Sequence, residues 1–299
     1  MRVRDLQKID ESYALVLGTC GYESRSTFIC QLDVHAPTRL AMLVGQPDPA
    51  VRENRDAFQR SGWETTGLRE ALTMLRNVDS GSRVCVDISS MPRRQMAMVV
   101  EAAWQERERI RSVDFLYCPA RYEGSHAAAM RDEVLSAAPI SEFFSGALRA
   151  PSLPVGLVAG LGLEPHRVPG LVELLEPAQT WAFMNVNHDS RFDVARDSLY
   201  SGVLERISAV TLEYRLDSIA ETFRRLESLV FSVKGRFRLV LAPSGPKMFA
   251  LACLLAGAER AVDRPAVWRV GSAGPRLPVD VEATGDVVAA RLSWSRVAE

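Results

Sequence analysis

The chain has 299 residues, of which 47% are hydrophobic and 24% are charged, and these values are ordinary for a soluble globular protein of one or two domains. The formal net charge of −1 argues against a broad DNA-binding surface, although 36 Lys and Arg side chains leave room for a local basic pocket. The sequence shows neither a signal-peptide pattern nor an apolar run of about 18 residues, so we expect a cytoplasmic protein without a membrane segment.

The five cysteines and four histidines do not suggest a metal site. No CxxC pair is present, and the histidines lack the spacing of metal ligands. We therefore expect free thiols in a reducing compartment, and neither a bound metal nor a cofactor.

The first half of the chain alternates short apolar runs with amphipathic stretches. The pattern predicts strands at 13–18, 39–45, 63–68, 82–89 and 112–118, and helices at 24–33, 48–62, 69–78 and 92–110. Such alternation favours a parallel sheet with helices on both faces.

The second half repeats this order. Strands are predicted at 155–162, 180–186, 209–216, 236–243 and 265–270, and helices at 164–177, 191–207, 217–233 and 245–259. Residues 119–154 read as a connector with a helix near 126–137, and the tail 271–299 reads as a β-hairpin around "EATGDVV".

The turns of the two halves also match. After the first strand the chain reads "GYESR" at 21–25 and "GLEPHR" at 162–167, and after the fourth strand it reads "SMPR" at 90–93 and "SGPK" at 244–247. We infer an internal duplication. The predicted fold class is α/β, with two Rossmann-like parallel-sheet domains at 1–150 and 151–299 and a C-terminal β-hairpin.

These turns are candidate ligand sites, because strands one and four of a doubly wound sheet lie side by side where ligands bind. The helices that begin at Pro92 and Pro246 offer free backbone N–H groups to an anion or nucleotide. The candidate ligand-binding residues are Gly21, Glu23, Arg25, Ser89, Ser90 and Arg93 in the first half, and Glu164, Arg167, Ser244 and Lys247 in the second.

Some of these residues have simpler interpretations. A cation in the first turn of a helix costs up to about 1 kcal/mol, and a bound anion would explain why one occurs there twice. The alternative is that the serines only cap the helices and that Arg93 and Lys247 are solvated. Each Glu–Arg pair after a first strand either forms an ion pair at the surface or contacts ribose and base edges.

Catalytic candidates are few. Asp87 ends strand four in the first half, where the second half has Leu241, so Asp87 is either catalytic or a ligand of ribose hydroxyls. Glu23 is a second candidate acid, whereas Cys20 has no histidine near it in the sequence to activate a thiol. The GxGxxG, Walker A, GxSxG and HExxH patterns are absent.

The turn after strand four resembles the signature of CARF (CRISPR-associated Rossmann fold) proteins and of the related SAVED domains. "LAPSGPKMFALACLLA" is the closer match and "VDISSMPRRQMAMVVEAA" the looser one, each with Pro where the family favours Gly and Thr. SAVED proteins look like two fused CARF units. The resemblance implies a sensor of cyclic oligonucleotides in bacterial anti-phage defence that acts with a separate effector protein.

Some CARF members cleave their ligand, so the resemblance leaves an alternative open. In that alternative the chain is a nucleotide-processing enzyme, either a ring nuclease or a phosphoribosyl- or nucleoside-transfer enzyme, and uses Asp87 or Glu23.

Overall fold

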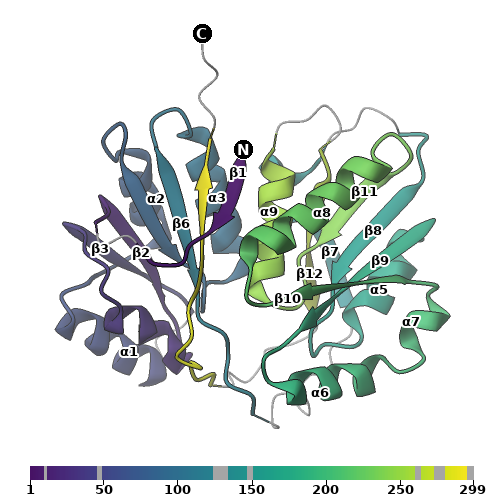
Figure 1. Ribbon diagram of the computed structural model, residues 1–299, viewed down its shortest axis with the longest axis horizontal. Coiled ribbons are helices and arrows are strands. Elements are labelled where there is room, and N and C mark those ends of the chain that lie inside the picture. Colours follow the sequence, from purple (N-terminus) through teal and green to yellow (C-terminus); the bar gives the residue numbers. More distant parts are fainter. Residues whose placement is uncertain are drawn as a thin grey trace. The chain divides into compact units, whose positions relative to one another are not determined.

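The computed structural model describes residues 1–9, 12–45, 49–123, 134–146, 151–259, 264–272 and 280–294. The chain forms two compact units (Figure 1). The first unit comprises Met1–Arg121, Ser218–Ala220 and Leu277–Glu299, and the second comprises Tyr122–Asp217 and Glu221–Arg276.

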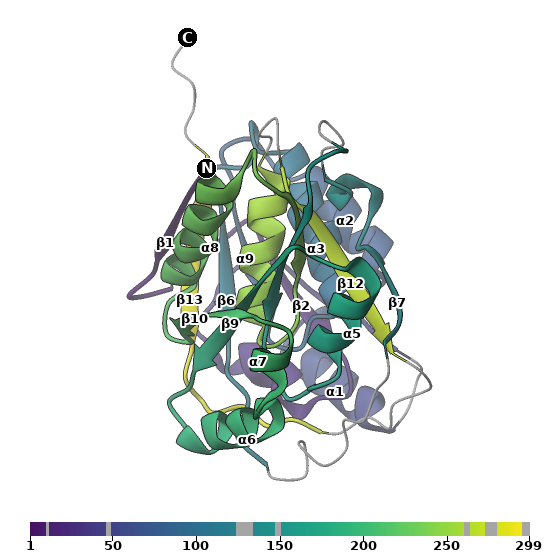
Figure 2. The ribbon, with the colours of Figure 1, turned by 90° about the vertical axis from the view of Figure 1, so that its right-hand side faces the viewer.

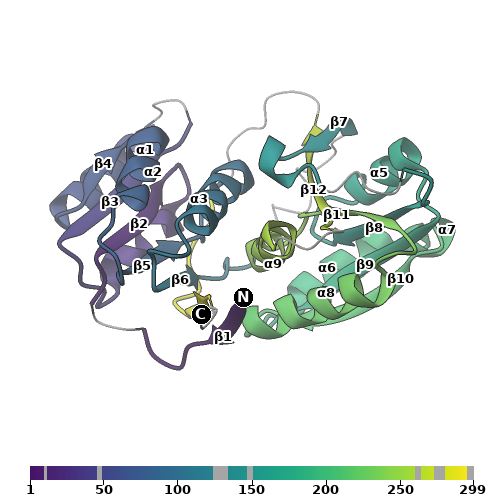
Figure 3. The same ribbon diagram turned by 90° about the horizontal axis from the view of Figure 1, so that it is seen from above.

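The first unit is built on a seven-stranded sheet with the order β1-β13-β6-β5-β2-β3-β4. Its five parallel strands are β2 (Leu15–Cys20), β3 (Thr38–Leu43), β4 (Glu64–Thr66), β5 (Arg83–Asp87) and β6 (Ser112–Tyr117). The helical segments are η1 (Ser24–Gln31), α1 (Pro49–Arg60), α2 (Leu68–Arg76) and α3 (Arg93–Gln105). η1 packs with α1, and α2 packs with α3, as in a doubly wound sheet. Figure 3 shows α1, α2 and α3 together with the strands of this sheet.

The second unit is built on a six-stranded sheet with the order β10-β9-β8-β11-β12-β7. Its parallel strands are β8 (Val155–Gly160), β9 (Gln179–Val186), β10 (Val210–Arg215), β11 (Arg238–Ala242) and β12 (Ala266–Ser272). The helical segments are η2 (Glu142–Phe144), α5 (Arg167–Leu175), α6 (Ser190–Tyr200), α7 (Val203–Arg206), α8 (Ile219–Val233) and α9 (Lys247–Ala258).

The predicted fold class, two Rossmann-like α/β halves, is confirmed. When the five parallel strands of each unit are numbered by their position in the chain, their order across the sheet is 3-2-1-4-5 in both units. The first and fourth strands are neighbours in each sheet, β2 beside β5 and β8 beside β11. β2 and α9 are buried along their whole described length except for Lys247, which agrees with their near-continuous apolar sequences.

The predicted C-terminal hairpin is not formed by the described residues. β13 (Val288–Ser293) instead pairs antiparallel with β6 and with β1 (Arg2–Asp5), and it is the yellow strand beside β6 in Figure 1. The connector supplies the matching strand of the other sheet, because β7 (Val134–Pro139) pairs antiparallel with β12 (Figure 2). Each half therefore gives its sixth strand to the sheet of the other half.

This exchange moves the unit boundaries away from the predicted 1–150 and 151–299. The second unit begins at Tyr122, and the first unit takes back the C-terminal residues from Leu277. Sequence periodicity predicts that β7 and β13 are strands or connectors, but it carries no information on which sheet each one joins.

Local details also differ from the predicted elements. The segment Ser24–Gln31 is a 3₁₀ helix rather than an α-helix, and the predicted helix at 191–207 is divided by Gly202, whose φ is +69°. Of the predicted helix near 126–137, residues 126–133 lie outside the described residues and 134–137 form part of β7. Within the described ranges, no helix combines the length and apolarity that crossing a bilayer requires.

Candidate functional site

The two turns singled out in the sequence meet in each unit at the carboxyl ends of the first and fourth parallel strands. In the first unit, the hydroxyl of Ser90 donates to the carbonyl of Thr19 on β2, with 3.3 Å between the oxygens. In the second unit, Gly245 has a φ of +73°, and a Cβ there would overlap the carbonyl oxygen of Leu161. Glycine is needed where these backbones approach so closely.

The two Glu–Arg pairs occupy matched positions and both are ion pairs. Nε of Arg25 lies 2.7 Å from the carboxylate of Glu23, and Nη2 of Arg167 lies 2.8 Å from that of Glu164. All four side chains are at most 14% exposed, so these are buried pairs, whereas the sequence left open either a surface ion pair or contacts to ribose and base edges. Within each pair the two charges neutralise each other. An anionic ligand would therefore be attracted mainly by cations outside these pairs.

Those cations stand at the first positions of two helices. Pro92 caps α3 with φ/ψ of −59°/140°, and Pro246 caps α9 with φ/ψ of −58°/148°. Arg93 and Lys247 follow as the first helical residues, and both side chains are half-buried. The first N–H groups of a helix have no acceptor within it, so both units present the same combination of backbone donors and a cation.

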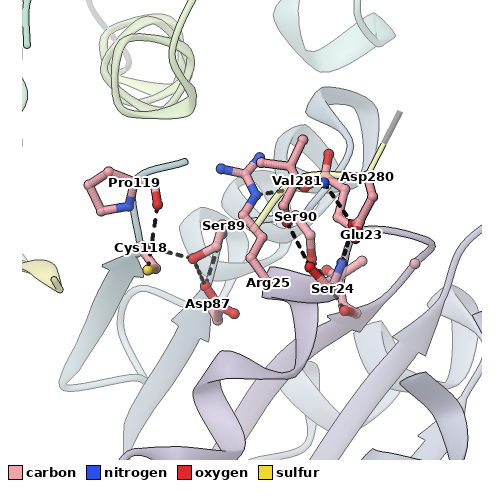
Figure 4. Close-up of polar contacts among 12 residues, drawn as sticks. Glu23, Ser24, Arg25, Asp87, Ser89, Ser90, Cys118, Pro119, Asp280 and Val281 are labelled. Atoms are coloured by element: carbon pink, nitrogen blue, oxygen red, sulfur yellow. Dashed lines mark hydrogen bonds and ion pairs between the residues drawn. The ribbon is translucent and has the colours of Figure 1, made fainter. Parts of the chain in front are cut away.

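A polar network closes the end of β5 in the first unit (Figure 4). The hydroxyl of Ser89 donates to the carboxylate of Asp87 and accepts the backbone N–H of Cys118 at 2.8 Å, while the Ser89 N–H donates to the same carboxylate at 2.9 Å. Asp87 and Ser89 are 3% and 2% exposed. This network joins β5 to the chain after β6, and it engages two of the predicted site residues in internal hydrogen bonds.

Burial also sets the protonation of nearby phenols and thiols. It raises the pKa of Tyr117, and the adjacent Arg25 guanidinium opposes that rise. It raises the pKa of Tyr200, whose hydroxyl donates to the Glu164 carbonyl at 3.1 Å. Burial raises the pKa of Cys20 to about 11, so this thiol is protonated near neutral pH and is a poor nucleophile.

Asn54 supports the first turn and was missed by the sequence analysis. Its Nδ2 donates to the carbonyls of Gly21 at 2.8 Å and Glu23 at 3.1 Å. Asn54 lies with Val51 and Phe58 on the buried face of α1. A polar residue at the helical spacing of buried apolar residues could have indicated from the sequence that Asn54 makes internal hydrogen bonds.

The segment Asp280–Gly285, which we call the C-terminal strap, also contacts the turn that follows β2. Asp280 accepts the backbone N–H of Ser24 at 2.6 Å, and the carbonyl of Val281 accepts the N–H of Arg25 at 3.1 Å. At its other end, the carbonyl of Glu282 accepts the N–H of Arg121 at 2.9 Å. Figure 4 shows Asp280 and Val281 next to Glu23 and Ser24, with Cys118 and Pro119 on the far side of Asp87.

The strap therefore crosses the carboxyl end of β5, because β5 lies between β2 and β6 in the sheet. The sequence predicts this segment as part of a hairpin and gives no sign that it reaches the ligand-binding edge.

The described residues contain no group of three His, Cys, Asp or Glu side chains that could hold a metal ion. Comparison with protein-family models and with curated proteins finds no match to this chain.

Proposed function

We propose that this protein binds a nucleotide second messenger, a cyclic oligonucleotide, as the sensor of a bacterial anti-phage defence system that acts with a separate effector protein. The observation that carries the proposal is the matched pair of turns. Both units place a Ser-x-Pro-cation turn at the switch point of a doubly wound sheet, which is where such folds bind ligands.

Cyclic oligonucleotides carry several phosphates, and each unit, taken by itself, offers first-turn amides and a half-buried cation suited to a phosphate. The resemblance of both turns to the CARF and SAVED signature points to the same ligand class.

The alternative of a nucleotide-processing enzyme has less support from the geometry. A general acid or base must reach the reacting atom, but Asp87 accepts two hydrogen bonds from Ser89, and Glu23 is paired with Arg25. Both carboxylates therefore serve internal contacts in the folded chain.

The experiment is calorimetric titration with cyclic di-, tri- and tetranucleotides, followed by chromatography of the ligand after incubation. Arg93→Ala and Lys247→Ala should each weaken binding by about 1.5–3 kcal/mol, the range for a charge-assisted hydrogen bond. Arg94→Ala is the matched control, because Arg94 lies in the same turn of α3 with an exposed side chain.

Ligand that stays intact, with affinity lost only in the two site variants, supports the sensor. Turnover by the natural chain that disappears in Asp87→Asn would instead identify an enzyme. Failure of every cyclic nucleotide to bind would refute both the sensor and the ring nuclease.

A further inference from the structure

We propose that Arg191 and Tyr122 form a stacking platform for a planar heterocycle, a nucleobase of the ligand, at the carboxyl edge of the second sheet. The inference rests on the proposed function for the class of ligand, and it names the residues that bind a base. The turns described above offer backbone donors and cations for phosphates, whereas a nucleotide also presents its base.

The guanidinium group of Arg191 is held in place by two neighbours. Its carbon Cζ lies over the Tyr122 ring, 5.1 Å from the ring centre. Its Nε and Nη2 lie 2.9 Å and 2.6 Å from the two carboxylate oxygens of Asp189. Phe192 meets the Tyr122 ring edge-on, with 4.8 Å between the ring centres. A stack that is ordered before the ligand arrives loses less conformational entropy on binding.

The guanidinium group nevertheless remains accessible to a ligand. The Arg191 side chain is 64% exposed although it lies over Tyr122. Within the described ranges, its side chain donates to Asp189 through Nε and Nη2 only, which leaves Nη1 able to donate to an acceptor on a base. A guanidinium group is planar and weakly hydrated, and proteins that bind single-stranded RNA stack bases on such planes and on aromatic rings.

The charges favour a base over a phosphate at this position. The hydrogen bond from Arg191 lowers the pKa of Asp189, so this carboxylate stays ionised near neutral pH and neutralises the guanidinium. The pair therefore has no net charge to attract an anion, whereas stacking needs an accessible plane. Every base has a flat π-face, so we expect the platform to accept different bases.

A second ion pair in the same unit shows what is particular to the platform. Arg215 and Asp217 are also two positions apart, and their side chains are 64% and 33% exposed, against 64% and 34% for Arg191 and Asp189. Among the described residues, however, no aromatic ring lies under Arg215. An exposed Arg–Asp pair thus does not require a ring behind it, and Arg215 is a matched control.

The platform stands at the ligand-binding edge of the second sheet. Arg191 lies in the first turn of α6, which follows the carboxyl end of β9 at Val186. β9 pairs in parallel with β8, and β8 pairs in parallel with β11, which leads into the turn before Lys247. In the proposed arrangement, the phosphate lies at the start of α9 and the base lies on Arg191, on the two sides of the end of β8.

The test uses the full chain and the 5′-monophosphate of 2-aminopurine riboside, a nucleotide whose base fluorescence falls when the base stacks. Arg191→Lys keeps the charge and removes the plane, and it should weaken binding of this probe roughly tenfold, within the range for one lost stacking contact. Tyr122→Leu removes the ring behind the guanidinium and should weaken binding by a smaller factor. Arg215→Lys should bind the probe as the natural chain does, and ribose 5-phosphate, which lacks the base, should not distinguish Arg191→Lys from the natural chain.

Equal weakening in Arg191→Lys and Arg215→Lys would overturn the inference, because the effect would then not depend on the ring. Base fluorescence that does not change when the natural chain is added would also overturn it. If cyclic oligonucleotides fail to bind while Arg191→Lys still weakens binding of the probe, the proposed function is refuted and the platform stands. If they bind the natural chain and Arg191→Lys equally well, the platform is refuted and the proposed function stands.

Discussion

Replacing Arg291 with Met should destabilise the first unit strongly, because Arg291 fixes β13 to the sheet through a buried carboxylate. Arg291 and Asp114 lie directly opposite each other on β13 and β6, and Nε and Nη2 of Arg291 each lie 2.7 Å from an oxygen of Asp114. The hydroxyl of Tyr13 donates to the same carboxylate, also at 2.7 Å.

The magnitude follows from the burial of Asp114, whose side chain is 0% exposed. Removing one partner of a buried ion pair costs about 3–5 kcal/mol, because the remaining charge loses its compensation. Arg121→Met is the matched control, since it removes the half-exposed pair with Glu282 and should cost less than about 1 kcal/mol.

The assay is equilibrium urea unfolding followed by circular dichroism, with hydrogen exchange of β6 and β13 to assign the transition to the first unit. The double variant with Asp114→Asn and Arg291→Met should regain part of the lost stability, because no buried charge is left. A loss below about 1 kcal/mol in Arg291→Met alone would refute the claim that this pair holds β13 in place.

Three further predictions concern the exchange of strands, a buried thiol and a close backbone approach. Fragments 1–150 and 151–299 should each fail to fold alone, because each lacks the sixth strand of its sheet, and should form a soluble complex when co-expressed; two independently folded fragments would contradict the exchange. Cys20, whose pKa is raised to about 11, should resist alkylation at pH 8, and rapid labelling of the native chain would contradict this protection. The stabilising effect of the protonated thiol should be present below about pH 9 and lost as the pH rises toward 11. Gly245→Ala should lower the melting temperature clearly while Gly21→Ala leaves it nearly unchanged, since a Cβ overlaps the Leu161 carbonyl in the first case and meets nothing within 4 Å in the second; equal effects would contradict the close approach of the turns.

Elements with strong periodicity were predictable from sequence alone. The ten parallel strands follow from alternating apolar runs and helices, and the proline caps of α3 and α9 follow from Pro92 and Pro246. These features depend on residues close together in the chain, so local propensity and spacing are enough to predict them.

The features that were missed depend on contacts between residues far apart in the chain. Arg291 must find Asp114, 177 positions away, before β13 can be assigned to the first sheet. Asp280 must find Ser24, 256 positions away, before the strap is recognised. Nothing in the local sequence around these residues specifies the partner, and so a hairpin was predicted where an exchanged strand and a strap occur.

The most direct test of the central claim is a hydrogen-exchange footprint of the full chain with and without a saturating cyclic oligonucleotide. We expect added protection at the starts of two helices, in peptides that cover 88–96 and 242–250, because ligand phosphates would accept hydrogen bonds from the first amides of α3 and of α9. Protection confined to other segments, or no change at any cyclic oligonucleotide concentration, would contradict the assignment of these matched turns as the ligand site.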